Sequence, residues 1–241
     1  MKLKKNQVIS LKLPEFEVDN PLSPHLDEIP LLSYLNKSFA CSFIGRAGSG
    51  KTSLMTGLLQ TKNKFKKVFH KIYLFMPKYS RGSMKKCVFD CLPEDQIYND
   101  LNIDTLTDVY NKIETNTEEG LLSLIILDDV QDAFKGDCEE LLLKIINNRR
   151  HLRTSIMIIA QSYIKMSRDV RKVLTNHFLF NLSKEEYEDI HKERVYMNKK
   201  KWETILKQYR KTNNNKGNFL FLDPEKVKVF INWDEVIDDE E

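Results

Sequence analysis

The sequence predicts an α/β fold with three layers, in which helices cover both faces of a mainly parallel central β-sheet. Five short apolar segments, of the type that forms buried strands, alternate along the chain with segments of helical periodicity. Parallel neighbours need a crossover connection, usually a helix, and strands that are covered on both faces are apolar throughout. Ligands of such sheets bind at the carboxyl ends of the strands. Residues that can take part in ligand binding (Gly45, Asp128 and Gln161) follow three of the five expected strands.

The expected elements follow one another regularly from residue 39 onward. The buried strands are expected at 39–44, 68–76, 121–127, 155–160 and 177–182. The helices are expected at 51–59, 94–100, 104–114, 138–149, 166–174, 184–194 and 199–210. Two further strands, 219–222 and 227–231, are expected to form a hairpin.

Composition divides the 241-residue chain into four expected parts. Residues 1–31 are an irregular lead-in, because four of the seven prolines lie there. Residues 32–195 carry the alternating pattern, 196–233 add a basic helix and the hairpin, and 234–241 form an acidic tail. The total charge of +3 hides this asymmetry, since the last eight residues hold six acids and the other 233 carry +9. The basic body is either ordinary solvated surface or a surface for a polyanion.

The composition also excludes several classes of protein. Hydrophobic residues make up 41% of the chain, enough to bury a core, and 8 Gly and 7 Pro exclude collagen-like and low-complexity chains. The chain shows neither an export signal at its start nor an apolar run of the ~20 residues that a membrane span needs. Four cysteines do not form a disulfide framework or a zinc site, so we expect reduced thiols in a soluble protein.

A complete GxxxxGK[ST] motif follows the first strand and opens the first helix, the context that identifies a phosphate-binding loop. Its glycines let backbone N–H groups face the phosphates, and the helix N-terminus adds positive potential. Lys51 is expected to reach the β- and γ-phosphates of ATP, and the Thr52 hydroxyl is expected to bind Mg²⁺. The predicted nucleotide-binding residues are Gly45, Arg46, Ala47, Gly48, Ser49, Gly50, Lys51, Thr52 and Ser53.

Paired carboxylates follow the third strand, in the Walker B pattern. Asp128 is expected to hold Mg²⁺, directly or through water, and Asp129 lies where many ATPases place a glutamate that polarises the attacking water. Aspartate is one methylene shorter than glutamate, so the sequence leaves open whether the Asp129 carboxylate reaches that water. The alternative interpretation is a strand end followed by an aspartate that caps a helix.

Two more polar features flank the strand 155–160. Gln161, directly after it, is expected to contact the γ-phosphate or the water, although it could also be a solvent-facing strand end. Arg149 and Arg150, before it, are candidates for a guanidinium that neutralises charge in the transition state, supplied by a neighbouring subunit of a ring. Basic residues at a helix end are also favoured by the helix dipole, so the alternative for either arginine stays open.

Together, the segments FIGRAGSGKTSL, LIILDDVQD, NNRRHLRTSIMIIAQSY and FLFNLSKEEYEDI resemble the viral genome-packaging ATPases of the poxvirus, giant-virus and virophage type, in the FtsK/HerA superfamily. The resemblance covers about residues 32–195. It implies the additional-strand ATPase class of P-loop NTPase, a ring of five or six subunits, and ATP-driven transfer of double-stranded DNA into a preformed capsid. It implies catalytic roles for Lys51, Asp129, Gln161 and either Arg149 or Arg150.

The resemblance also implies partners and a location. The partners are double-stranded DNA, further copies of the chain, and a capsid or portal-vertex protein. The location is the host-cell cytoplasm, at the viral factory, or the virion. Two alternatives remain: a nucleoside or nucleotide kinase, and an ATP-binding interaction protein without hydrolysis. A GTPase is disfavoured, because every Asn-Lys pair lacks the aspartate of an NKxD motif.

Overall fold

The computed structural model describes Leu35 and residues 38–60, 65, 67–82, 88–212 and 217–237. The expected lead-in at 1–31 and the acidic residues 238–241 lie outside this part of the chain. Among the described helices, none combines the length and the apolar character that a membrane span requires.

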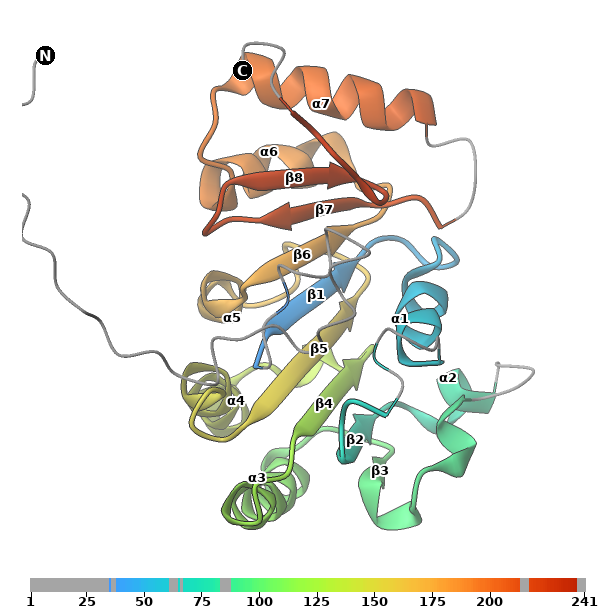
Figure 1. The fold of residues 1–241 in the computed structure, drawn as a ribbon, viewed down its shortest axis with the longest axis vertical. Helices are drawn as coiled ribbons and strands as arrows, with labels where there is room; N and C mark the ends of the chain where they lie inside the picture. Colours follow the sequence, from blue (N-terminus) through green and yellow to red (C-terminus); the bar gives the residue numbers. More distant parts are fainter. Residues whose placement is uncertain are drawn as a thin grey trace, which may run out of the picture.

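The described strands form a nine-stranded sheet in the order β3-β2-β4-β5-β1-β6-β7-β8-β9 (Figure 1). Six strands run parallel: β1 (Ala40–Ile44), β2 (Lys71–Phe75), β3 (Ile97–Tyr98), β4 (Ser123–Asp128), β5 (Thr154–Ala160) and β6 (Asn176–Leu179). Three antiparallel strands extend the sheet beyond β6: β7 (Leu220–Asp223), β8 (Lys228–Ile231) and β9 (Asp234–Glu235). The α/β fold with a mainly parallel sheet is confirmed.

The central strands are buried on both faces, which explains why they are apolar throughout. Every residue of β1, β4 and β5 is buried. Alternate residues of a strand face opposite sides, so Ile125 and Leu127 of β4 join one core cluster while Leu124 and Ile126 join the other. The two clusters are the interfaces between the sheet and the two helical layers.

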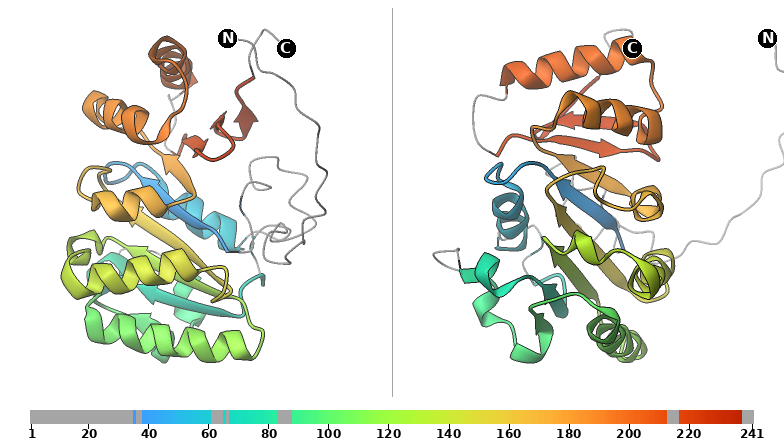
Figure 2. Two further views of the ribbon diagram at one scale, coloured as in Figure 1. Left: turned by 90° about the vertical axis from the view of Figure 1, so that its left-hand side faces the viewer. Right: turned by 180° about the vertical axis from the view of Figure 1, so that it is seen from behind.

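The helices divide unequally between the two faces (Figures 1 and 2). One face is covered by α3 (Ile103–Glu118), α4 (Gly136–Asn148), α5 (Arg168–Val173), α6 (Lys184–Arg194) and α7 (Lys199–Thr212). On the other face α1 (Lys51–Gln60) buries Met55 and Leu58 in the second cluster, beside several phenylalanines. The short helix α2 (Lys78–Gly82) follows β2.

Most of the expected elements are confirmed, but the helix expected at 94–100 is wrong. That segment forms a 3₁₀ turn at Glu94–Gln96 and then the edge strand β3. Tyr98 pairs with Phe75 across the strands, and their rings stack with centroids 4.8 Å apart. This packing against β2 outweighs the local helical tendency of a short segment.

The C-terminal part continues the same sheet. β7 pairs antiparallel with β6, and β8 follows as the predicted hairpin. On the helical layer, the Trp202 indole of α7 donates a hydrogen bond to the Tyr187 carbonyl of α6, over 3.3 Å. Residues 196–233 therefore extend both the sheet and the helical layer that begin before residue 195.

Candidate nucleotide-binding site

The candidate site lies where β4, β5 and β1 end, because these three strands are neighbours in the sheet and run parallel (Figure 1). A cavity of about 230 Å³ opens there. It is lined by Ala47, Gly48, Lys51, Thr52, Met76, Ser80, Asp128, Asp129, Ile159, Ala160 and Gln161. The structure thus brings together the glycine-rich loop, the paired carboxylates and the glutamine, which are far apart in the sequence.

The loop between β1 and α1 depends on glycine at two points. The Gly45 amide donates to the Ala160 carbonyl over 3.1 Å, which ties the loop to β5. A Cβ on Gly45 would lie 2.6 Å from the Cβ of Phe180, too close for any side chain. Gly50 has a φ of +103°, which L side chains rarely adopt, and a Cβ there would lie 2.8 Å from the Gly217 Cα. The loop is therefore enclosed by β5, β6 and the segment before β7.

Lys51, at the first position of α1, is buried with 8% of its surface exposed. Its Nζ donates to the carbonyl oxygens of Gly45, over 2.6 Å, and Arg46, over 3.0 Å. Burial lowers the pKa of this ammonium, and the nearby Asp128 and Asp129 carboxylates oppose that shift. The result is one cation held at the cavity beside two anions.

Thr52 and Asp128 form the candidate metal site. The Thr52 hydroxyl donates to Asp128 Oδ2 over 3.3 Å, which joins the start of α1 to the end of β4. Burial, followed by the charge of Asp129, raises the pKa of Asp128 to about 6, while Thr52 and Lys51 act in the opposite direction. A hydroxyl and a carboxylate are hard oxygen donors of the kind that Mg²⁺ prefers. The residues present therefore fit this ion.

The rest of the described chain agrees with a site of few protein ligands. No group of three or more His, Cys, Asp or Glu side chains is placed to hold a metal ion within the described residues. Mg²⁺ usually takes one or two carboxylates from the protein and completes its shell with water and substrate phosphates. Thr52 and Asp128 satisfy that requirement.

Asp129 and Gln161 form a pair at the mouth of the cavity. The Gln161 Nε2 donates to Asp129 Oδ1 over 2.9 Å. Asp129 has a φ of +58°, in the left-handed region that aspartate tolerates better than most residues, and its amide donates to the Ile159 carbonyl over 3.2 Å. Such strained backbone is often found at functional sites. The pair thus joins the residues that directly follow β4 and β5.

Not every predicted residue lines the cavity. Arg46 and Ser53 are exposed and outside its lining. Arg149 and Arg150 lie before β5, at the edge where β1 and β5 begin, so they are at the opposite edge from the phosphate-binding loop of their own chain. The half-buried Arg149 donates from Nε to the Ser38 carbonyl over 2.8 Å and from Nη1 to the Ile146 carbonyl over 3.0 Å. Burial and the charge of Arg150 lower the pKa of Arg149. Arg150 is exposed.

Several residues at the site were missed by the sequence reasoning. Met76 and Ser80 line the cavity because β2 ends beside β4. The Gly217 amide donates to the Ser49 carbonyl over 3.2 Å, so the segment before β7 contacts the glycine-rich loop. Nothing local in the sequence indicates these long-range contacts.

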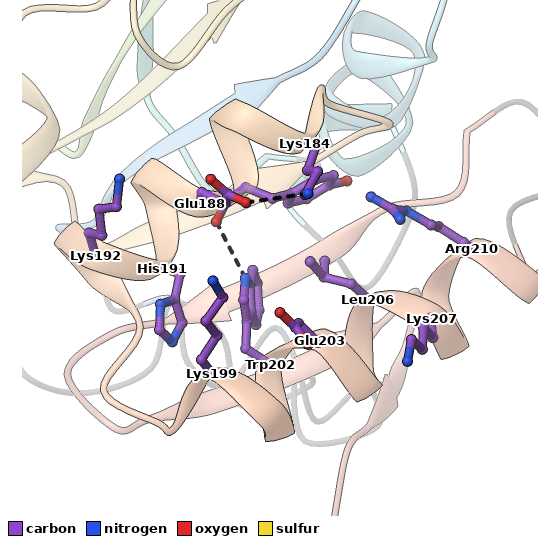
Figure 3. Close-up of a pocket in the computed structure, with 11 residues that line it drawn as sticks. Lys184, Glu188, His191, Lys192, Lys199, Trp202, Glu203, Leu206, Lys207 and Arg210 are labelled. Carbon is purple, nitrogen blue, oxygen red and sulfur yellow. Dashed lines mark hydrogen bonds and ion pairs between the residues drawn. The ribbon is translucent and has the colours of Figure 1, made fainter.

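A second pocket lies between α6 and α7, and we name it the α6–α7 groove (Figure 3). Its volume is about 340 Å³. Five cations line it: Lys184, Lys192, Lys199, Lys207 and Arg210. The other lining residues are Tyr187, Glu188, His191, Trp202, Glu203 and Leu206. Trp202 and Leu206 are almost fully buried, so the groove has an apolar floor and a charged rim.

Comparison with known proteins gives relatives by sequence. DNA packaging protein OPG160 of Vaccinia virus (strain Copenhagen) is 28% identical over 151 residues, which cover 62% of this chain and 55% of the relative. The protein of the same name from Variola virus gives the same values. The match thus spans about half the length of these relatives.

Solved structures give the fold. B204, the DNA-packaging ATPase from Sulfolobus turreted icosahedral virus, has a TM-score of 0.59 at 14% identity and covers 82% of this chain and 98% of its own. B204 from Sulfolobus turreted icosahedral virus 2, in complex with ATP-gammaS, has a TM-score of 0.57 at 14% identity, over 84% of this chain and 100% of its own. The fold is therefore that of P-loop packaging ATPases.

The family model described as Poxvirus A32 protein matches residues 31–232, which include the cavity, the arginine pair and the α6–α7 groove. The chain belongs to the poxvirus A32 protein family.

Proposed function

We propose that this chain is a Mg²⁺-dependent ATPase that drives double-stranded DNA into a preformed viral capsid. The observation that carries the proposal is the assembly of one buried cation, a hydroxyl–carboxylate pair and a carboxylate–amide pair in one cavity at the carboxyl edge of the sheet. The relatives are named DNA packaging proteins, and this supports DNA packaging as the process that the ATPase drives.

The roles follow from the positions of the side chains. Lys51 would bind the β- and γ-phosphates, since its ammonium is buried beside the glycine-rich loop. Thr52 and Asp128 would hold Mg²⁺, which supplies neutralisation of the charge on the phosphate oxygens. Backbone N–H groups at the start of α1 add positive potential at the same place.

Asp129 and Gln161 would act on the attacking water. The Asp129 carboxylate is the acceptor that can polarise the water, and its hydrogen bond to Gln161 fixes the direction of both side chains. Aspartate is shorter than glutamate, but Asp129 lines the cavity itself, beside Asp128 and Gln161. Water then attacks the γ-phosphorus, and ADP and inorganic phosphate are the products.

A ring of five or six subunits would complete the site. Because the arginine pair lies at the opposite edge of the sheet, neither arginine reaches the phosphates of its own chain, and a role for either requires a neighbouring subunit. Arg149 is half-buried and Arg150 is exposed, so Arg150 is the more accessible candidate for the finger. Mixing Arg150→Ala with Asp129→Asn subunits should restore part of the hydrolysis that each variant lacks. Absence of rescue at every ratio would exclude Arg150 from this role.

Double-stranded DNA would be contacted by cations of α6 and α7, which follow phosphates without reading bases. The α6–α7 groove gathers five of these cations on one surface (Figure 3). A capsid or portal-vertex protein would be the second macromolecular partner. The place of action would be the host-cell cytoplasm, at the viral factory, or the virion.

The central experiment measures ATP hydrolysis with and without double-stranded DNA, together with particle mass in the presence of a non-hydrolysable ATP analogue. The proposal expects phosphate release that DNA stimulates and a mass of five or six chains. Transfer of phosphate to a nucleoside or nucleotide would instead indicate a kinase. ATP binding without turnover would indicate an interaction protein.

A further inference from the structure

The two residues after Gln161 are held by a single carboxylate on α6. Glu186 Oε1 accepts the Ser162 hydroxyl over 2.7 Å and the Tyr163 amide over 2.9 Å. Gln161 itself follows the last residue of β5. The backbone of Gln161 is therefore fixed on one side by the sheet and on the other by Glu186.

Glu186 is itself held in place. It lies in the first turn of α6, where Ser183 and Glu186 form a capping box. The Ser183 amide donates to Glu186 Oε2 over 3.3 Å, and the Glu186 amide donates to the Ser183 hydroxyl over 3.2 Å. Both carboxylate oxygens are thus used, one toward the cap and one toward the segment after Gln161. Hydrogen bonds to an ionised acceptor are stronger than neutral ones.

The other end of the same segment is tied to the last turn of α6. Glu193 accepts the Tyr163 hydroxyl over 2.9 Å and forms an ion pair of 2.8 Å with the buried Arg171. Arg171 Nη1 also donates to the carbonyls of Tyr163, Ile164 and Met166, over 3.2–3.3 Å. The segment that follows Gln161 is therefore bonded to both ends of α6.

We infer that Glu186 is a positioning residue for hydrolysis, which acts through Gln161 and ties α6 to the nucleotide cavity. The inference rests on the proposed function, because it assigns Glu186 a role in that reaction. Gln161 can direct its amide toward Asp129 and a γ-phosphate only while its backbone is held in place. The hydrogen bonds that Glu186 accepts from the next two residues, Ser162 and Tyr163, hold that backbone. One wall of the α6–α7 groove is the same helix (Figure 3), so this contact also joins the two pockets.

The experiment compares Glu186→Ala and Glu186→Gln with the wild type and with Glu185→Gln. Glu185 is exposed in the same turn of α6 and also interacts with Ser183, so it serves as the control for the helix cap alone. We expect Glu186→Ala to lower kcat about ten-fold with little change in KM for ATP, since small misplacement of a positioning group acts on the transition state. Glu186→Gln retains an acceptor oxygen and should recover most of the rate. If Glu186→Ala does not fold, the rate of Glu186→Gln still tests the inference.

A double-variant cycle separates positioning from general destabilisation. In a Gln161→Ala background, loss of Glu186 should change kcat less than two-fold, because the group that it positions is already gone. The same fractional loss in both backgrounds, or an unchanged kcat in the single variants, would overturn the inference.

A binding measurement makes the inference testable without turnover. Preference for ADP with aluminium fluoride, a transition-state analogue, over ADP alone, measured by calorimetry, should fall in Glu186→Ala by about the same factor as in Gln161→Ala, and Glu185→Gln should keep it. A wild type that shows this preference but no hydrolysis would refute the proposed motor and the role of Glu186 in hydrolysis, and would leave only its positioning of Gln161. A wild type that hydrolyses ATP while Glu186→Ala keeps both rate and preference would refute the inference alone.

Discussion

The nucleotide cavity and the α6–α7 groove both gather cations, but they hold them in opposite ways. In the cavity a single buried ammonium, Lys51, is bonded to loop carbonyls and faces two carboxylates. In the groove five cations stand on an exposed rim above an apolar floor. A buried charge acts at one point and at short range, whereas exposed charges are screened by salt and act by their sum.

The two regions should therefore respond differently to substitution. Removal of the one buried cation should abolish a specific step, and no neighbour can replace it. Removal of one rim cation should weaken a distributed attraction and leave the rest in place. The following predictions test that contrast in order of expected effect.

The largest effect is expected for Lys51→Ala. The substitution removes the ammonium from the phosphate-binding loop while leaving the apolar contacts of α1, so ATP hydrolysis should fall by at least about 10²-fold, as for loss of a single transition-state donor. Hydrolysis is measured by phosphate release, and circular dichroism checks that the variant is folded. The matched control is Lys207→Ala in the exposed rim, which should hydrolyse ATP normally in the absence of DNA. Equal rates in both lysine variants would erase the contrast between the regions.

Burial of the Asp128 carboxylate in the cavity should lower the free energy of unfolding at neutral pH. Burial first, and then Asp129, raise the pKa of Asp128 to about 6, from an ordinary value of 3.8. Between these values the folded protein binds more protons than the unfolded chain, so the free energy of unfolding falls as pH rises through this window. Above pH 6, Asp128 is ionised in the folded protein, and the loss of stability that its burial causes is complete.

Asp128→Asn should remove this cost while it removes the metal ligand. At pH 7.5 in EDTA, its free energy of unfolding should exceed that of the wild type by up to about 3 kcal/mol, since each pKa unit corresponds to about 1.4 kcal/mol. The advantage should vanish near pH 4, and Mg²⁺-dependent hydrolysis should be lost. Urea unfolding at several pH values measures the difference in the free energy of unfolding, with the exposed Asp132→Asn as control. A variant that is no more stable at pH 7.5 would contradict a free-energy cost of burying the Asp128 carboxylate.

The sequence predicts the cavity better than anything else in the molecule, for a physical reason. The glycine-rich loop and Asp128 each follow an apolar strand directly, so short-range pattern places them at strand ends, and parallel topology brings strand ends together. The same reasoning places Gln161 at that edge. The neighbouring chain that Arg149 or Arg150 would need is not encoded in the local sequence pattern. The contact of Arg149 with Ser38 is likewise made at long range, so the pattern does not indicate which arginine is the more exposed.

Contacts made at long range could not be predicted. The capping box of Ser183 and Glu186 is readable as a helix start, but the second use of Glu186, toward Ser162 and Tyr163, depends on α6 packing beside the end of β5. Gly217 reaches the phosphate-binding loop only because β7 pairs with β6. The wrong helix at 94–100 has the same origin, since stacking of Tyr98 on Phe75 decides its conformation.

The smallest effects are expected in the groove, and they should appear only with DNA. Lys199→Glu should lower DNA-stimulated hydrolysis several-fold at low salt, while basal hydrolysis and the KM for ATP stay unchanged, because Lys199 lies on α7 and the contact with the cavity is made by Glu186 of α6. If Lys199 contacts one phosphate, the slope of log affinity against log salt should become shallower by about 0.9. The measurement is anisotropy of a labelled duplex across a salt series, with Lys67→Glu, exposed in the turn before β2, as the control. A lower basal rate would mean that groove and cavity are not separable in the way their burial indicates. The same slope in both variants would show that the cations of the groove do not hold DNA, and that their concentration between α6 and α7 serves another partner.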